Sequence, residues 1–428
     1  MQKSRALTQS WYPIFAVGLT MVSFIMIKTG RDAVFFQEGG LRKLPIVYIW
    51  IAVAAIPAAV LHLRALDRWG ARKTRTSLFF LTALLFLPFI PFVDTHHPRA
   101  MTLFFIFVPP IFAAVFAGAW LLASDLLEGA DGAVLRKVYT RIGAASMVGG
   151  ISGGFLSKGI SLIVEPRYLV AGGASILIGT GFLVAQAHRR NPVEMLVPKP
   201  RGSKNNHTAH VTFGGPQSIL MRQRYTLVLI GISTLATIAA LYIDFQFYAT
   251  ATITGNSNAQ FFANFYIVLN LVSLAIQLFV APRLQARLGV IGALLLLPTA
   301  LLGGAGLFSF WSIVQGRTVL KVLEGGLKSS IHRSMWEQVY LPINRKFRDM
   351  AKMVVDGAVQ RLAEGLGSVA LLVWLRANDL PLNQLNYGWI TWVIVAAIVL
   401  WILLTRALGA LGCSDVTPTE PFIRLPDG

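Results

Sequence analysis

The stretch LPIVYIWIAVAAIPAAVLHL, residues 44–63, contains no Asp, Glu, Lys or Arg. As an α-helix, an apolar segment of about 20 residues spans about 30 Å, the thickness of the hydrocarbon core of a bilayer. Similar blocks recur along the chain, which is 55% apolar and only 13% charged over 428 residues. This is too little charge to cover the surface of a soluble protein of that length. The composition therefore predicts an integral membrane protein.

The apolar blocks predict about 12 transmembrane helices, six on each side of a polar linker that contains Pro and Gly. The predicted spans are 11–30, 44–63, 77–93, 101–123, 142–163, 168–187, 225–248, 261–280, 289–308, 310–328, 352–375 and 387–405. We expect an N-terminal six-helix half at 1–187, a cytoplasmic linker at 188–224, a C-terminal half at 225–408 and a cytoplasmic tail at 409–428. The predicted fold class is an all-α membrane protein with two six-helix halves.

The net charge of +19 predicts the orientation of the chain. Lys and Arg concentrate after the second span, in the linker and before the eleventh span, and such loops face the cytoplasm. Both termini are therefore predicted to be cytoplasmic, and the protein to lie in a bacterial inner membrane. This rule explains most of the positive charge, so membrane lipid is an expected partner and nucleic acid is not.

The two halves also show similar residues at corresponding places. Asp32 ends the first span and Asp244 lies in the seventh, while Gly70 follows the second span and Gly289 follows the eighth. Six-helix halves related by duplication, with a site at their interface, are typical of secondary transporters.

Charged side chains inside the predicted spans are the candidate site, because a charge at the bilayer centre normally faces a partner or a water-filled cavity. The tenth span carries a stripe of this kind on one helical face, formed by Arg317, Lys321, Glu324 and Lys328. The predicted substrate-binding residues are Arg31, Asp244, Gln246, Arg317, Lys321 and Arg361. The residues predicted to balance charge or take part in proton coupling are Asp32, Glu324 and Glu364. Interdomain ion pairs that stabilise one conformation are the alternative reading of these charges.

Other motifs favour structure over catalysis. The segment GAASMVGGISGGFLSKG, 143–159, lacks the G-K-[ST] of a phosphate loop, but Gly149-x-x-x-Gly153 and Gly150-x-x-x-Gly154 favour close helix packing. No catalytic constellation or set of metal ligands is evident, so we expect no enzyme activity, no metal and no cofactor.

The segment LHLRALDRWGARKTR, 61–75, resembles the signature loop of the major facilitator superfamily. That resemblance implies a gating role for Asp67, Arg68, Gly70 and Lys73. Within the superfamily, KTGRDAVFFQEGGLRKLP (28–45), DFQFYATA (244–251) and the segment from 324 to 367 resemble the ATP/ADP translocase-like branch, which implies nucleotide transport. Tyr248 stands where that branch often has a lysine.

Three functions follow from these patterns. The first is a secondary transporter that moves a small anionic solute by alternating access, with protons or a counter-transported anion as coupling partner; the resemblance implies a nucleotide-like solute. The second is an efflux carrier for a hydrophobic, peptide-like or lipid-like solute, suggested by the phenylalanines of the seventh and eighth spans. The third is a membrane scaffold or sensor that transports nothing.

Overall fold

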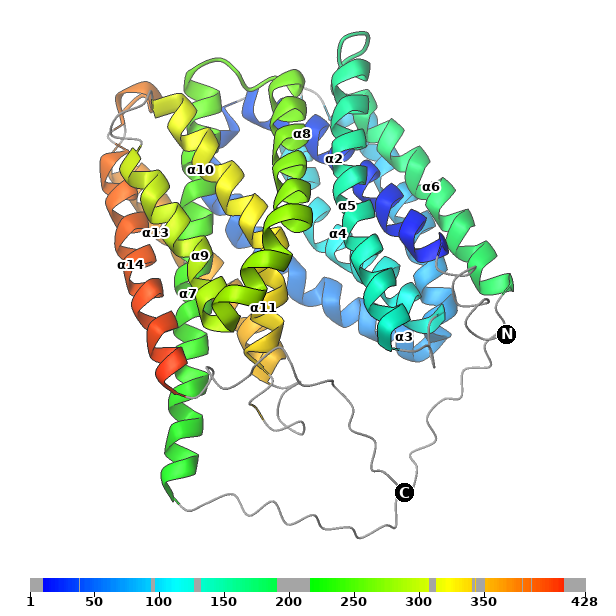
Figure 1. The fold of residues 1–428 in the computed structure, drawn as a ribbon. Helices are drawn as coiled ribbons and strands as arrows, with labels where there is room; N and C mark the ends of the chain where they lie inside the picture. Colours follow the sequence, from blue (N-terminus) through cyan, green and yellow to red (C-terminus); the bar gives the residue numbers. More distant parts are fainter. Residues whose placement is uncertain are drawn as a thin grey trace, which may run out of the picture.

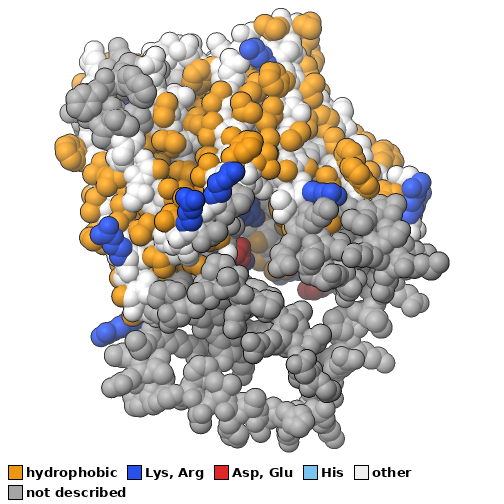
Figure 2. Space-filling view, in the orientation of Figure 1, with side chains coloured by type: hydrophobic (Ala, Val, Ile, Leu, Met, Phe, Trp, Pro, Cys, Tyr) orange, Lys and Arg blue, Asp and Glu red, His pale blue; other side chains and the backbone are white. Residues whose placement is uncertain are grey.

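The computed structural model describes residues 11–37, 39–93, 97–126, 132–190, 216–307, 313–340, 343, 351–378, 380–385 and 387–411. Within these ranges the regular secondary structure is helical. Nine of the described helices are long and apolar enough to cross a membrane. Most of the large apolar side chains exposed in this structure belong to these helices, and Figure 2 shows them spread over the visible face of the bundle. The chain is an integral membrane protein.

The N-terminal part contains five long helices, two of which are joined by the short 3₁₀ helix η1 (Gly40–Arg42). These helices are α2 (Trp11–Gln37), α3 (Leu44–Phe86), α4 (Pro98–Leu126), α5 (Gly132–Ile160) and α6 (Arg167–Arg190). Helix α3 and the 3₁₀ helix η2 (Leu87–Phe92) cover the predicted second and third spans together.

The C-terminal part contains the remaining spans, several of them extended by π-helical segments. Its elements are α7 (Pro216–Ile253), α8 (Ala259–Ala275), η3 (Ile276–Val280), α9 (Ala281–Leu307), α10 (Ile313–Leu327), η4 (Lys328–His332), α11 (Arg333–Gln338), η5 (Met353–Val359), α13 (Gln360–Ala377), η6 (Leu382–Gln384) and α14 (Gly388–Ala410). Helices α5 and α10 are not among the nine apolar helices, because α10 has only 15 residues and α5 is rich in glycine. Together with the two crossings of α3, they account for the 12 predicted spans.

Two glycines break the helices at corresponding places in the halves. Gly70 in α3 has φ 75°, and Gly289 in α9 has φ 64°. Both values lie in the left-handed region that only glycine adopts without steric cost. A Cβ on either residue would meet nothing within 4 Å, so backbone conformation and not packing requires glycine there. The shared break supports the predicted relation between the two halves.

Several helices extend beyond the predicted spans. Helix α2 runs to Gln37 instead of ending at residue 30, because Arg31 and Asp32 are buried against other helices instead of lying at the membrane surface. Helix α6 continues to Arg190 and α7 begins at Pro216, so both ends of the predicted linker are helical. Residues 191–215 of the linker and 412–428 of the tail lie outside the described residues.

The two halves contact each other through a few helix pairs. Helices α5 and α8 pack together along the middle of the bundle, and α3 packs against α13. Figure 1 shows α2 to α6 (blue to green) on one side and α7 to α14 (green to red) on the other, with α5 beside α8 at the boundary. Helix α5 also packs against α2, so it lies between a helix of its own half and one of the other half.

The glycines of α5 permit both contacts, as the sequence predicted. A Cβ on Gly149 would lie 2.2 Å from the backbone oxygen of Gly18 in α2. On the other face, a Cβ on Gly150 would lie 2.3 Å from the side chain of Asn270 in α8. Such distances are far below van der Waals contact, so only glycine allows the helices to approach this closely.

We expect Gly149→Ala to destabilise the protein by about 1–3 kcal/mol, because the added methyl group meets backbone and forces α2 and α5 apart. The matched control is Gly159→Ala in the same helix, where a Cβ would meet nothing within 4 Å. Thermal unfolding of the purified protein in detergent measures both variants. Equal melting temperatures for the two variants would contradict the packing described here.

Candidate functional site

A cavity of about 760 Å³ lies between the two halves. Its lining comes from α2, α3 and α4 on one side and from α7, α10, η4, α11, η5 and α13 on the other. Figure 2 shows a hollow in the middle of the molecule in which acidic side chains are visible. A charged cavity between the halves is the arrangement that the buried charges of the sequence predicted.

One end of the cavity is formed by a cluster around Asp32 of α2, which is fully buried. Arg31 donates to Asp32 Oδ1 from Nε at 2.8 Å and from Nη2 at 2.6 Å. Asp32 Oδ2 accepts from the hydroxyl groups of Tyr266 at 2.6 Å and Tyr248 at 3.2 Å, and it lies 3.4 Å from Lys28 Nζ. The carboxylate therefore joins α2 to helices α7 and α8 of the other half.

Lys28 and Arg31 line the cavity, whereas Asp32 lies behind them. The guanidinium of Arg31 also stacks on the ring of Phe105, 3.8 Å from the ring centroid, which is a favourable cation–π arrangement. Two cations against one carboxylate leave one positive charge facing the cavity at this end.

A second cluster surrounds Lys321 in α10. Its Nζ lies 2.7 Å from Asp244 Oδ1 in α7 and 2.5 Å from Glu324 Oε2, and Lys328 Nζ lies 3.2 Å from Glu324 Oε1. Lys321 and Glu324 are largely buried, with side-chain exposures of 15% and 4%. The stripe of the tenth span is thus largely an ion-pair network, and Asp244 and Lys328 are its members that face the cavity.

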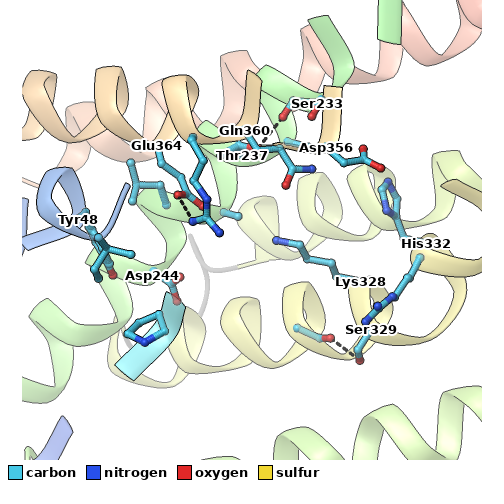
Figure 3. Close-up of a pocket in the computed structure, with 18 of the residues that line it drawn as sticks. Tyr48, Ser233, Thr237, Asp244, Lys328, Ser329, His332, Asp356, Gln360 and Glu364 are labelled. Carbon is cyan, nitrogen blue, oxygen red and sulfur yellow. Dashed lines mark hydrogen bonds and ion pairs between the residues drawn. The ribbon is translucent and has the colours of Figure 1, made fainter. Parts of the chain in front are cut away.

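The third group lies on α13 and the π-helical turn before it. Asp356, Gln360 and Glu364 are spaced four residues apart and all line the cavity (Figure 3). Glu364 Oε2 accepts from Arg361 Nη1 at 2.7 Å, and Asp356 Oδ1 accepts from Trp336 Nε1 and from the Tyr340 hydroxyl, both at 2.7 Å. Figure 3 shows Lys328 projecting into the space between Asp244 and this row.

The halves are joined beyond the Asp32 cluster. Phe36 stacks on Tyr248 with ring centroids 4.2 Å apart, and Arg42 Nη2 donates to the backbone oxygen of Leu380 at 2.6 Å. The cavity lining extends in the other direction to Trp336 and Glu337 in α11, near the end of the bundle that the sequence predicts to be cytoplasmic. We refer to the end with the Asp32 cluster as the closed end.

The structure places the predicted site residues in three groups. Four of them line the cavity: Arg31, Asp244, Arg361 and Glu364. Three do not line the cavity but form ion pairs with residues that do: Asp32 with Arg31, Lys321 with Asp244, and Glu324 with Lys328. Two lie outside the lining: Gln246 donates to the Thr391 hydroxyl at 2.8 Å, and Arg317 donates to the Thr250 hydroxyl at 3.1 Å and lies over the Tyr387 ring.

The predicted gating residues Asp67, Arg68, Gly70 and Lys73 lie in α3 around its break. Thr74 donates from its hydroxyl group to the backbone oxygen of Ala65 at 2.8 Å across this break, which fixes the angle between the two parts of the helix. Asp67 makes no ion pair with any described residue. Their role in gating stays a prediction.

The phenylalanines that suggested a hydrophobic solute occupy a different place. Phe245, Phe247, Phe262 and Phe265 are buried, and Phe247 makes ring contacts with both Phe262 and Phe265. They therefore pack within the C-terminal half and, through the contact of Phe262 with Phe36, against α2, and they do not line the cavity.

Most lining residues were not predicted as site residues, among them Lys28, Tyr48 and Tyr248. Lys28 pairs with Asp32, Tyr48 of α3 lies beside the cavity in Figure 3, and Tyr248 donates to Asp32. The i, i+4 spacing of Lys28 and Asp32 could have indicated their pairing. A tyrosine in an apolar helix carries no such signal, because its hydroxyl partner is set by the tertiary fold.

Solved structures of other proteins share this architecture, whereas comparisons of the sequence found no match. No protein-family model matches the chain, and no curated protein sequence does. Among solved structures, the chain is similar to the nucleoside transporter NupG, with 13% identity over 94% of this chain and 98% of that one and a TM-score of 0.62. It is also similar to a bacterial homologue of the iron transporter ferroportin in an inward-facing state, with 13% identity, coverage of 94% and 99%, and a TM-score of 0.63. A D-xylose-proton symporter matches with 13% identity, coverage of 94% and 97%, and a TM-score of 0.61.

Similarity at this level establishes the fold. The chain has the major facilitator fold of two six-helix halves, as the sequence predicted. The three proteins named are transporters. In the described ranges, no three His, Cys, Asp or Glu side chains come close enough together to hold a metal ion.

Proposed function

We propose that the chain is a secondary transporter that moves a small solute bearing an acidic group by alternating access. The observation that carries this proposal is the single positive charge that Lys28 and Arg31 leave facing a cavity between two halves. In a medium of low dielectric constant, such a charge attracts an anion more strongly than it would in water. The contacts at the closed end define one of the two states that alternating access requires.

The nucleotide-like solute implied by the sequence resemblance is the more specific form of this proposal. Two features bear on it. Aromatic side chains of Tyr48 and Phe105 line the cavity, and a base can stack on such rings. However, the five cationic side chains of the lining face four carboxylates, so only one positive charge is in excess; the cations are Lys28, Arg31, Lys328, Arg333 and Arg361, and the carboxylates are Asp244, Glu337, Asp356 and Glu364. The lining therefore fits a solute with one or two acidic groups better than a nucleoside triphosphate.

We expect Lys28→Met to lower the uptake of an anionic solute at least tenfold, because the charge that faces the cavity is then cancelled by Asp32. The assay is uptake of labelled organic acids and nucleotides into liposomes that contain the purified protein. Lys158→Met is the control, since Lys158 lies in α5 and is not part of the cavity lining. Wild-type uptake by the Lys28 variant would contradict the proposal, and so would wild-type protein that transports no member of the panel.

A further inference from the structure

Two of the carboxylates that line the cavity, Asp244 and Glu364, can accept further hydrogen bonds from a bound solute. Asp244 uses Oδ1 to accept from Lys321, and Glu364 uses Oε2 to accept from Arg361. Within the part of the chain that the structure describes, their other carboxylate oxygens have no hydrogen-bond partner. Each of the two side chains is 31% exposed, and both line the cavity. A carboxylate accepts about four hydrogen bonds in all, so each of these groups can still accept from a solute.

These open oxygens lie at the same end of the cavity as the positive charge. The side chains of Asp244 and Lys321 lie close enough to Lys28 to interact with it electrostatically. Tyr48 interacts in the same way with Asp244 and Arg31. Figure 3 shows Tyr48, Asp244 and Glu364 near one another at the left of the view. The cations and the open carboxylates therefore face one volume at the closed end.

The two kinds of charge come from different halves. Lys28 and Arg31 belong to α2 of the N-terminal half, whereas Asp244 and Glu364 belong to α7 and α13 of the C-terminal half. A solute with an acidic group at one end and an amine at the other would contact both halves with matching charges. An ammonium group has three N–H donors and no acceptor, which suits carboxylate oxygens.

We infer that this site takes a zwitterionic solute of the amino-acid or short-peptide class, with its acidic group at Lys28 and Arg31 and its primary ammonium group at Asp244 and Glu364. This inference rests on the proposed function and adds the second charge to the solute. A solute that is held by both halves favours the arrangement in which they approach each other, and so it links binding to closure of the cavity. A ligand shifts such an equilibrium only through a difference in affinity between the two states.

The test is ligand-dependent thermal unfolding of the purified full-length chain. Pools of L-amino acids and dipeptides are screened first, followed by the N-acetyl derivative and the C-terminal amide of each compound that stabilises the protein. We expect the zwitterion to raise the melting temperature, and each derivative to bind at least tenfold more weakly. Organic monoanions and nucleotides form the second probe set.

Variants assign the two ends of the solute. Glu364→Gln should weaken binding of the zwitterion while leaving the already weak binding of its N-acetyl derivative unchanged. Lys28→Met should weaken binding of the zwitterion while leaving that of its amide unchanged. Glu165→Gln is the matched control, because Glu165 pairs with Arg167 and is not part of the cavity lining.

The outcomes separate this inference from the proposed function. If N-acetyl derivatives or organic anions bind as tightly as any zwitterion and Lys28→Met weakens them, the inference is overturned and the proposed function stands. Stabilisation by organic anions alone, with no response to the zwitterion pools, has the same meaning. If the amides bind as tightly as the zwitterions, the acidic group is not recognised and both proposals fall. If neither probe set changes the melting temperature, both fall as well.

Discussion

Replacing Lys321 with methionine is expected to destabilise the protein by about 3–5 kcal/mol, the usual cost of removing one partner from a buried ion pair. Methionine keeps the length of the side chain but leaves Asp244 and Glu324 without their shared cation. The loss is large because Glu324 is almost fully buried and water cannot replace Lys321 there. Thermal unfolding in detergent, with and without lipid, measures the effect.

Two further variants test the cause. Lys328→Met removes the other cation that pairs with Glu324, but the Lys328 side chain is 57% exposed, so we expect a change of about 0–1 kcal/mol. In the triple variant Lys321→Met, Asp244→Asn, Glu324→Gln no carboxylate is left without a cation, so most of the lost stability should return. A single Lys321 variant as stable as the Lys328 variant would show that the network is not a stabilising centre.

This expectation changes how the charged stripe of the tenth span is interpreted. The i, i+3 spacing of Lys321 and Glu324 is that of neighbours on a helix, and the two side chains form an ion pair. The sequence could not show that Asp244 of α7 completes the pair, because that contact depends on how two helices pack. Loss of transport in a Lys321 variant would therefore reflect lost structure as well as lost binding, whereas Lys28 and Glu364 test the solute more directly.

The helix pattern was more predictable than the site. Apolar length predicted the spans, since backbone groups in lipid must be satisfied within each helix. Glycine spacing predicted the close contacts of α5, because a missing side chain acts locally. The end of α2 was placed too early, since a charged pair such as Arg31 and Asp32 resembles a membrane boundary until its partners are known. Those partners are tyrosines more than 200 residues away, which no local pattern indicates.

The tyrosine partners lead to the second large effect. We expect Tyr266→Phe to open the closed end, because the Tyr266 hydroxyl donates to Asp32 across the two halves at 2.6 Å. A hydrogen bond to a charged group contributes about 1.5–3 kcal/mol. If the bond is broken when the closed end opens, its loss shifts the ratio of the two states by about 10- to 100-fold. Asp32 still accepts from Arg31 and Tyr248, so the protein should remain folded.

Distances between spin labels at the closed end measure this shift. Lys43 follows η1 and Gln384 ends η6, and both residues are exposed, so cysteines at these positions can carry labels once Cys413 has been replaced by serine. The Tyr266 variant should show a larger population at long distance than the wild type. Tyr242→Phe is the control, because the Tyr242 hydroxyl donates to Gly367 within the C-terminal half. Identical distance distributions for Tyr266→Phe, Tyr242→Phe and the wild type would show that the tyrosine does not hold the halves together. In that case the contacts of Phe36 with Tyr248 and of Arg42 with Leu380 would have to keep this end closed.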